Sequence, residues 1–149
     1  MDFHLDTLLN LPNVVADSYA STLDAIVVKL QLVNAGINCP NCSKYISQVH
    51  QTRSVLVRDL SIFGQVVYLK VPRRQFYCST CKKSPTEPFL WVNRKQRQTN
   101  RYQEYIYERV KELTVKQVSG NEKMSEDAVQ DIFHKVASSK KKAGGILND

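Results

Sequence analysis

Long apolar runs and a secretion signal are both missing from this chain of 149 residues. Its first residues, Met1-Asp2-Phe3-His4, have neither the basic start nor the continuous apolar stretch of a signal peptide. No apolar run approaches the roughly 20 residues that a membrane-spanning helix needs. These absences argue against secretion and membrane insertion, so we expect a cytoplasmic protein in a reducing compartment.

An unpaired cysteine is also missing, because all four cysteines fall into two C-x-x-C pairs, Cys39-Pro-Asn-Cys42 and Cys78-Ser-Thr-Cys81. Each pair puts two sulfur atoms on one tight turn, and two such pairs supply the four thiolates of a tetrahedral zinc site. Two disulfides or a redox-active pair are the alternatives. Disulfides need an oxidising compartment, and a redox motif usually needs only one C-x-x-C. We therefore predict one structural Zn²⁺ bound by Cys39, Cys42, Cys78 and Cys81.

Acidic residues are scarce in the middle of the chain. Residues 39–111 carry 14 Lys and Arg against 4 acids, whereas residues 1–38 have a net charge of −3 and residues 112–149 are balanced. A basic block around a zinc ribbon is typical of a surface that binds a polyanion, most simply nucleic acid. A solvated basic face with no partner is the alternative. The predicted phosphate contacts are Arg73, Arg74, Arg94, Lys95, Arg97 and Arg101.

The order of strand-like and helix-like patterns predicts an α+β protein, with a small β-rich zinc ribbon, an N-terminal hairpin and a following helical segment. Pro12 ends a short leucine-rich helix, and Phe63-Gly64 is a turn signal between two strands of the ribbon. The expected segments are residues 1–38, an N-terminal helix and β-hairpin packing on the ribbon; residues 36–92, the Cys₄ zinc ribbon; residues 98–137, helical and helix-turn-helix-like; and residues 138–149, a disordered tail.

The helical segment has cap signals at both of its predicted helix starts. Thr99 or Asn100 can cap the first helix, and Ser125 can cap the last one. A break at residues 119–121 between them produces the pattern of a helix-turn-helix. The last helix begins with acidic residues that repel phosphate, although such residues can accept a hydrogen bond from cytosine. A plain helical hairpin that packs and reads no DNA is therefore the alternative.

These motifs occur together in an order that resembles a known family. The leucine-rich stretch before Pro12, both cysteine pairs, Arg58-Asp59-Leu60 with Gly64, and Arg73-Arg74-x-Phe76 ahead of Cys78 precede the helical segment. This set looks like the N-terminal part of the ISL-three group of insertion-sequence transposases. In that family a zinc finger and a helix-turn-helix precede an RNase-H-like catalytic domain.

The resemblance implies a partner and a limit on activity. It implies binding to double-stranded DNA at the terminal inverted repeats of a mobile element, in the cytoplasm of a bacterium and associated with its nucleoid. No set of carboxylates suggests the family's catalytic metal site. We therefore expect no enzymatic activity and a truncated or N-terminal piece of a transposase.

Other functions stay open at this point. A zinc ribbon can also serve as a protein–protein adaptor, with the basic surface meeting an acidic partner. A truncated copy can instead compete with full-length transposase, which is then a further candidate partner.

Overall fold

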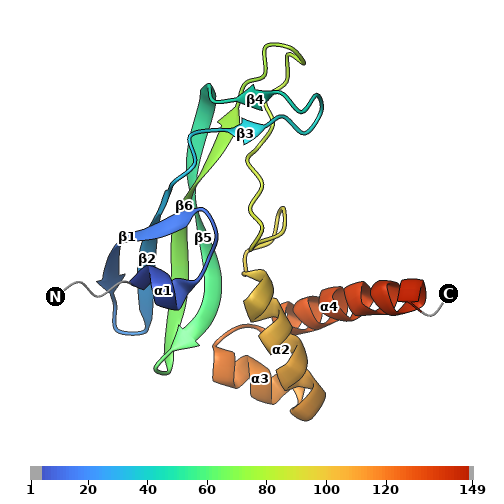
Figure 1. Ribbon diagram of the computed structural model, residues 1–149. Coiled ribbons are helices and arrows are strands. Elements are labelled where there is room, and N and C mark those ends of the chain that lie inside the picture. Colours follow the sequence, from blue (N-terminus) through green and yellow to red (C-terminus); the bar gives the residue numbers. More distant parts are fainter. Residues whose placement is uncertain (1–4, 148–149) are drawn as a thin grey trace. The chain divides into compact units, whose positions relative to one another are not determined.

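The structure, a computed structural model, describes residues 5–147 and the side chains of residues 5–143. The chain forms two compact units, one ending at Arg97 and the other starting at Gln98 (Figure 1). The described part of the first unit is mostly β-structure, and that of the second consists of three helices. This arrangement confirms the predicted α+β class, with a β-rich zinc-ribbon region followed by helices.

A four-stranded sheet is the main element of the first unit. Its strands are β1 (Val14–Ser21), β2 (Ala25–Leu32), β5 (Val49–Ile62) and β6 (Gln65–Phe76), in the order β1-β2-β6-β5. Both β1–β2 and β5–β6 are antiparallel hairpins, whereas β2 and β6 are parallel. The sheet therefore joins two hairpins side by side.

The turn predicted at Phe63-Gly64 connects β5 to β6. Ile62 pairs with Gln65, so the loop has two residues, and both have positive φ, 50° at Phe63 and 77° at Gly64. Two consecutive residues of this kind form the type of turn whose twist matches that of an antiparallel hairpin. The local sequence therefore accounts for this hairpin.

The N-terminal segment differs from the prediction in how it packs. Helix α1 (Leu5–Leu9) precedes the β1–β2 hairpin, which pairs edge to edge with β6 instead of covering the ribbon. In β2, buried Val28 and Leu30 alternate with exposed Lys29 and Gln31, so one face of the strand joins the core of the sheet.

One apolar core lies under the sheet. It includes Val28, Leu30, Val57, Val67, Leu69 and Val71 from the strands, and Trp91 and Val92 from the segment after the second cysteine pair. Trp91 is 6% exposed and its ring stacks on Phe89 with centroids 5.0 Å apart. Trp91 therefore anchors the segment after the second cysteine pair on the core of the first unit.

The second unit is built from α2 (Asn100–Glu112), α3 (Val115–Glu122) and α4 (Glu126–Leu147). Thr99 caps α2 by accepting a hydrogen bond from the Tyr102 amide, and Ser125 accepts one from Ala128 at the start of α4. Both caps agree with the sequence. The apolar faces meet at a core of Tyr102, Ile106, Val118, Val129 and Ile132.

Two boundaries in this unit depart from expectation. The break expected at residues 119–121 lies inside α3, which ends at Glu122 and is followed by Lys123 as its C-cap, with a left-handed φ of 56°. The tail expected to be disordered over residues 138–149 is helical to Leu147, and the last two residues lie outside the described part. Lys and Ala favour helix in this stretch, and Lys140 forms a 2.7 Å ion pair with Glu104 of α2.

Candidate zinc centre and nucleic-acid interface

Each cysteine pair lies on a turn of the same construction. The amide of Ser43 donates to the carbonyl of Cys39 at 2.8 Å, and the amide of Lys82 donates to that of Cys78 at 2.7 Å. Ser43 and Lys82 each follow the second cysteine of a pair and have positive φ values of 65° and 56°. This left-handed residue folds the chain back and leaves both sulfur atoms of a pair on the same side.

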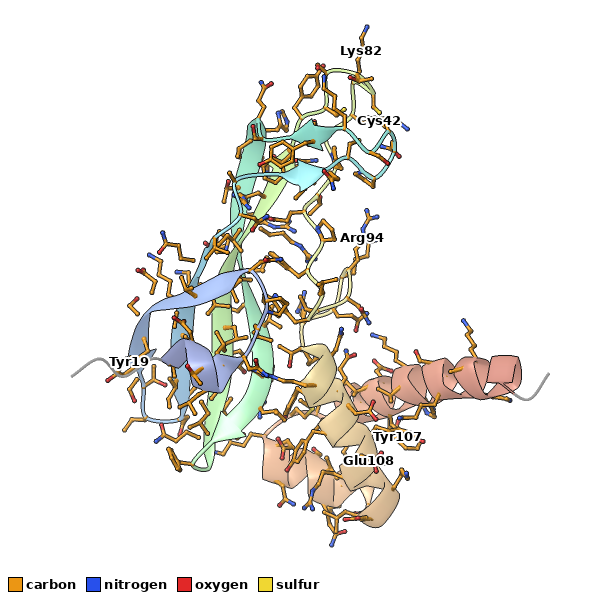
Figure 2. The ribbon with its side chains drawn as sticks, viewed as in Figure 1. Tyr19, Cys42, Lys82, Arg94, Tyr107 and Glu108 are labelled. Carbon is orange, nitrogen blue, oxygen red and sulfur yellow. The ribbon has the colours of Figure 1, made fainter. Side chains whose placement is uncertain are left out.

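The two turns meet at one end of the first unit. Strands β3 (Ile37–Asn38) and β4 (Tyr45–Ile46) pair on either side of the first turn. Across the second turn, Cys78 and Lys83 form an isolated antiparallel β-bridge through their backbones. Figure 2 places Cys42 and Lys82, one from each turn, at this same end. Pairs 36 residues or more apart in the chain are therefore brought together by the long β5–β6 hairpin.

The sulfur atoms have the spacing of a zinc site. The Cys39 and Cys81 sulfurs are 3.9 Å apart, the Cys42 and Cys78 sulfurs are 3.7 Å apart, and all four lie within 4.8 Å of one another. Four sulfurs at about 2.3 Å from one zinc ion are about 3.8 Å apart in a regular tetrahedron. A disulfide needs about 2.05 Å, and the four cysteines are free. The cluster fits one structural Zn²⁺, as predicted.

The surroundings of the thiols shift the pKa values of Cys39 and Cys81 in opposite directions. Amide groups of Asn41 and Cys42 donate toward the Cys39 sulfur and lower its pKa to about 7. Hydrogen bonding with Cys42 raises the pKa of Cys81 to about 12, with burial adding to the effect. Zinc binding displaces the thiol protons, because zinc binds cysteine as the thiolate.

An apolar cluster packs beside the cysteine cluster. Phe76 is fully buried and packs with Cys39, Cys78 and Ile46. Gly36 allows the chain to approach β4, since a Cβ there would lie 2.3 Å from the carbonyl oxygen of Ile46. Cys39, Cys78 and Cys81 therefore belong to a small core of their own, whereas Cys42 is exposed.

Arg74, one of the predicted phosphate contacts, forms an ion pair within the first unit. Its guanidinium donates from Nε and Nη2 to the two carboxylate oxygens of Glu87, at 2.9 and 2.8 Å, and also to the carbonyl of Asn34. Glu87 is only 2% exposed and accepts a further hydrogen bond from the side-chain amide of Asn34. The ion pair fastens the segment after the second cysteine pair to β6.

The other predicted contacts are distributed over both units. Arg73 is half-buried on β6, and Arg94, Lys95 and Arg97 are exposed in the segment that follows Val92. Arg101 is half-buried in the first turn of α2. A phosphate contact from these five residues stays a prediction.

Sequence reasoning missed Arg53, which lies directly opposite Arg73 across the β5–β6 ladder. Pairing the residues of the two strands one by one, starting from the Phe63-Gly64 turn, would have placed Arg53 near Arg73 in the ladder. The ladder register shifts between Asp59 and Ile62, however, so the pairing itself could not be counted from the turn.

The second unit has the elements of a helix-turn-helix. Thr114 starts α3 with a capping box, in which its hydroxyl accepts from the Gln117 amide while the Gln117 side chain accepts from the Thr114 amide. Three residues separate α3 from α4, and the first of them is the left-handed Lys123. The Tyr102 hydroxyl donates to Glu122 at 2.7 Å, which ties the end of α3 to α2.

A Cys₄ cluster suited to zinc, followed by a helix-turn-helix arrangement, is typical of a DNA-binding region. The family model described as the zinc-finger of transposase IS204/IS1001/IS1096/IS1165 matches residues 35–81. The model described as the helix-turn-helix domain of transposase family ISL3 matches residues 87–137. The two segments cover about two thirds of the chain, and this chain belongs to transposase family ISL3.

One curated relative shares part of the sequence. The transposase for insertion sequence element IS1001 from Bordetella parapertussis is 43% identical over 63 residues, which are 42% of this chain and 16% of the relative. No solved structure matches the chain. In the described part of the chain, no helix is both long enough and apolar enough to cross a membrane.

Proposed function

We propose that this chain binds duplex DNA and recognises the terminal inverted repeats of a mobile element, without performing the transposition chemistry itself. The observation that carries the proposal is the joint presence, in family order, of a Cys₄ centre and a helix-turn-helix match. The curated relative is named a transposase, and the two family models that match this chain describe a zinc-finger and a helix-turn-helix domain.

Zinc has a structural role in this proposal. Binding of four thiolates to one ion fixes the end of the first unit, because structural zinc contributes on the order of 10 kcal/mol to the folding of small domains. Basic side chains near the fixed turns then contact backbone phosphates, which gives affinity and register but no base reading.

Base reading falls to α4 in this proposal. In a helix-turn-helix the second helix enters the major groove with its first turns against the bases. The exposed residues there are Glu126, Asp127, Gln130 and Asp131. Gln suits adenine and the acids suit cytosine, while the acids repel phosphate. We therefore expect α4 to supply sequence preference more than affinity.

The salt dependence of DNA binding tests the proposal. Affinity for a duplex carrying an element end should fall as salt rises, because each neutralised phosphate releases counterions. It should also exceed the affinity for a scrambled duplex of equal length, measured by fluorescence anisotropy. Equal affinity for both duplexes would contradict recognition of the element end. An affinity that does not change with salt concentration would contradict the phosphate contacts. Cytoplasmic location at the nucleoid, and competition with full-length transposase for the same ends, follow from the same proposal.

A second candidate function, docking of another protein, is favoured by one apolar surface on the first unit. A cavity of about 650 Å³ is lined in part by Leu8, Tyr19 and Phe63, which are 65%, 70% and 98% exposed. Exposed apolar groups that gather around a hollow are typical of protein contacts. Binding of an acidic protein with no affinity for duplex DNA would favour this adaptor function over the first.

A further inference from the structure

Two arginines stand opposite each other on the β5–β6 ladder, where like charges destabilise a sheet. Arg53 and Arg73 are direct cross-strand partners, so their side chains lie on the same face. Arg94 is close enough that its charge, like that of Arg53, lowers the pKa of Arg73, with burial as the largest cause. Three positive charges thus converge on one place.

The nearby acid does not neutralise them. Glu87 is the one carboxylate among the residues that line the adjoining cavities, and both of its oxygens are engaged by Arg74. No ion pair with a described residue is found for Arg53, Arg73 or Arg94. The cluster keeps an uncompensated positive charge.

Arg73 is held in place with hydrogen-bonding capacity unused. Its guanidinium carbon lies 5.2 Å from the centre of the Phe89 ring, and Phe89 stacks in turn on buried Trp91. Its buried Nε has no hydrogen-bond acceptor in the part of the chain that the structure describes. A guanidinium oriented on an aromatic ring loses little freedom when an anion binds.

Two cavities give an anion access to this cluster. One of about 200 Å³ is lined by Gln51, Arg53, Arg73 and Thr86, and a second of about 730 Å³ by Arg73, Thr86 and Arg94, among others. They share Arg73, Gln75 and Thr86, so they form one continuous groove, here called the arginine groove: Gln51, Arg53, Arg73, Gln75, Thr86 and Arg94. Figure 2 shows Arg94 on the segment beside the sheet.

We propose that the arginine groove is a phosphate-binding site for the backbone of duplex DNA, in which Arg53, Arg73 and Arg94 clamp adjacent phosphates. Guanidinium groups bind phosphate through paired, charge-assisted hydrogen bonds. Gln51 and Thr86 add neutral donors beside the charges. The proposal rests on the proposed DNA binding and adds to it a defined site on the zinc-ribbon unit, with Arg53 as a residue not expected from the sequence.

The test compares charge-removing variants of the zinc-loaded full chain. Arg53→Gln and Arg94→Gln change exposed side chains, so both should fold, and Arg53→Gln relieves the cross-strand repulsion with Arg73. Each should make the slope of log affinity against log salt shallower by about 0.9. The matched control is Lys29→Gln, which removes one exposed charge on β2 outside the groove and should leave the slope unchanged.

The outcomes separate this proposal from the proposed function. Salt-dependent binding by the native chain, with Arg53→Gln and Arg94→Gln matching Lys29→Gln, would overturn the groove and leave DNA binding intact. A native chain that binds no duplex would overturn the proposed function before any variant is made. The proposed phosphate clamp would be supported if the slope of log affinity against log salt became shallower in both groove variants and stayed unchanged in Lys29→Gln.

Discussion

Neighbouring arginines on β6 have different environments. Arg74 donates two hydrogen bonds to the carboxylate of Glu87 in a nearly buried ion pair, whereas Arg73 faces Arg53 and has no carboxylate partner among the described residues. The sequence Arg73-Arg74 by itself gives no sign that the two side chains have different partners. Alternation along the strand sends them to opposite faces, which is why one is structural and the other is available to a ligand.

Glu87→Gln should destabilise the first unit strongly. The substitution keeps the shape of the side chain but leaves the Arg74 charge buried without its partner, which costs about 3–5 kcal/mol. Urea denaturation followed by tryptophan fluorescence measures the loss, because Trp91 lies in the same unit.

Asp17→Asn is the matched control for that variant. Asp17 forms an exposed pair with Lys29 at 4.0 Å, and exposed pairs contribute about 1 kcal/mol or less. Equal losses in the two variants would mean that the Arg74–Glu87 pair contributes no more than a surface contact.

The cysteine ligands show how far residue-level reasoning reaches. Both knuckles are set by contacts within six residues, such as the Ser43 amide to the Cys39 carbonyl, so spacing alone predicted them. Arg53 escaped prediction because its importance depends on a partner 20 positions away across a shifted register.

At the scale of elements, the helices were predicted best where caps are local. Thr99 and Ser125 cap α2 and α4 as the sequence indicates, but Gly120 does not end α3. Glycine in a helix costs only about 1 kcal/mol, and burial of Val118 together with the Tyr102–Glu122 hydrogen bond favours one more turn.

Thr114→Ala should weaken the helix-turn-helix by about 1 kcal/mol, since the capping box of α3 loses the hydroxyl that accepts from the Gln117 amide. The loss should appear as a lower urea midpoint of the helical signal at 222 nm. Lys116→Ala, at an exposed position of the same helix, should stay within about 0.5 kcal/mol of the native chain. If both variants lose the same stability, the capping box makes no special contribution.

At the scale of the whole molecule, two units with separate cores share one chain. The first has the cysteine cluster at one end and the sheet core elsewhere, and the second has buried residues of its own that include Ile106 and Val129. The N-terminal hairpin was expected as a cover and instead extends the sheet, because parallel pairing of β2 with β6 joins segments about 40 residues apart.

Removal of zinc should affect the two units differently. A chelator should abolish the amide NMR signals around both cysteine turns, while signals of α2, α3 and α4 persist because the three helices belong to a separate unit with buried residues of its own. Added zinc should restore the lost signals. Loss of both sets at the same chelator concentration would show that the second unit depends on the metal as well.

The sequence by itself determined the features whose causes lie within a few residues: the four zinc ligands, the Phe63-Gly64 turn, and the caps at Thr99 and Ser125. Only the tertiary structure decided that Arg74 pairs with Glu87, that Arg53 opposes Arg73, and that β2 lies beside β6. Local features follow from short-range sterics and hydrogen bonds. The others depend on strand register, which many distant side chains set together through the core that they share.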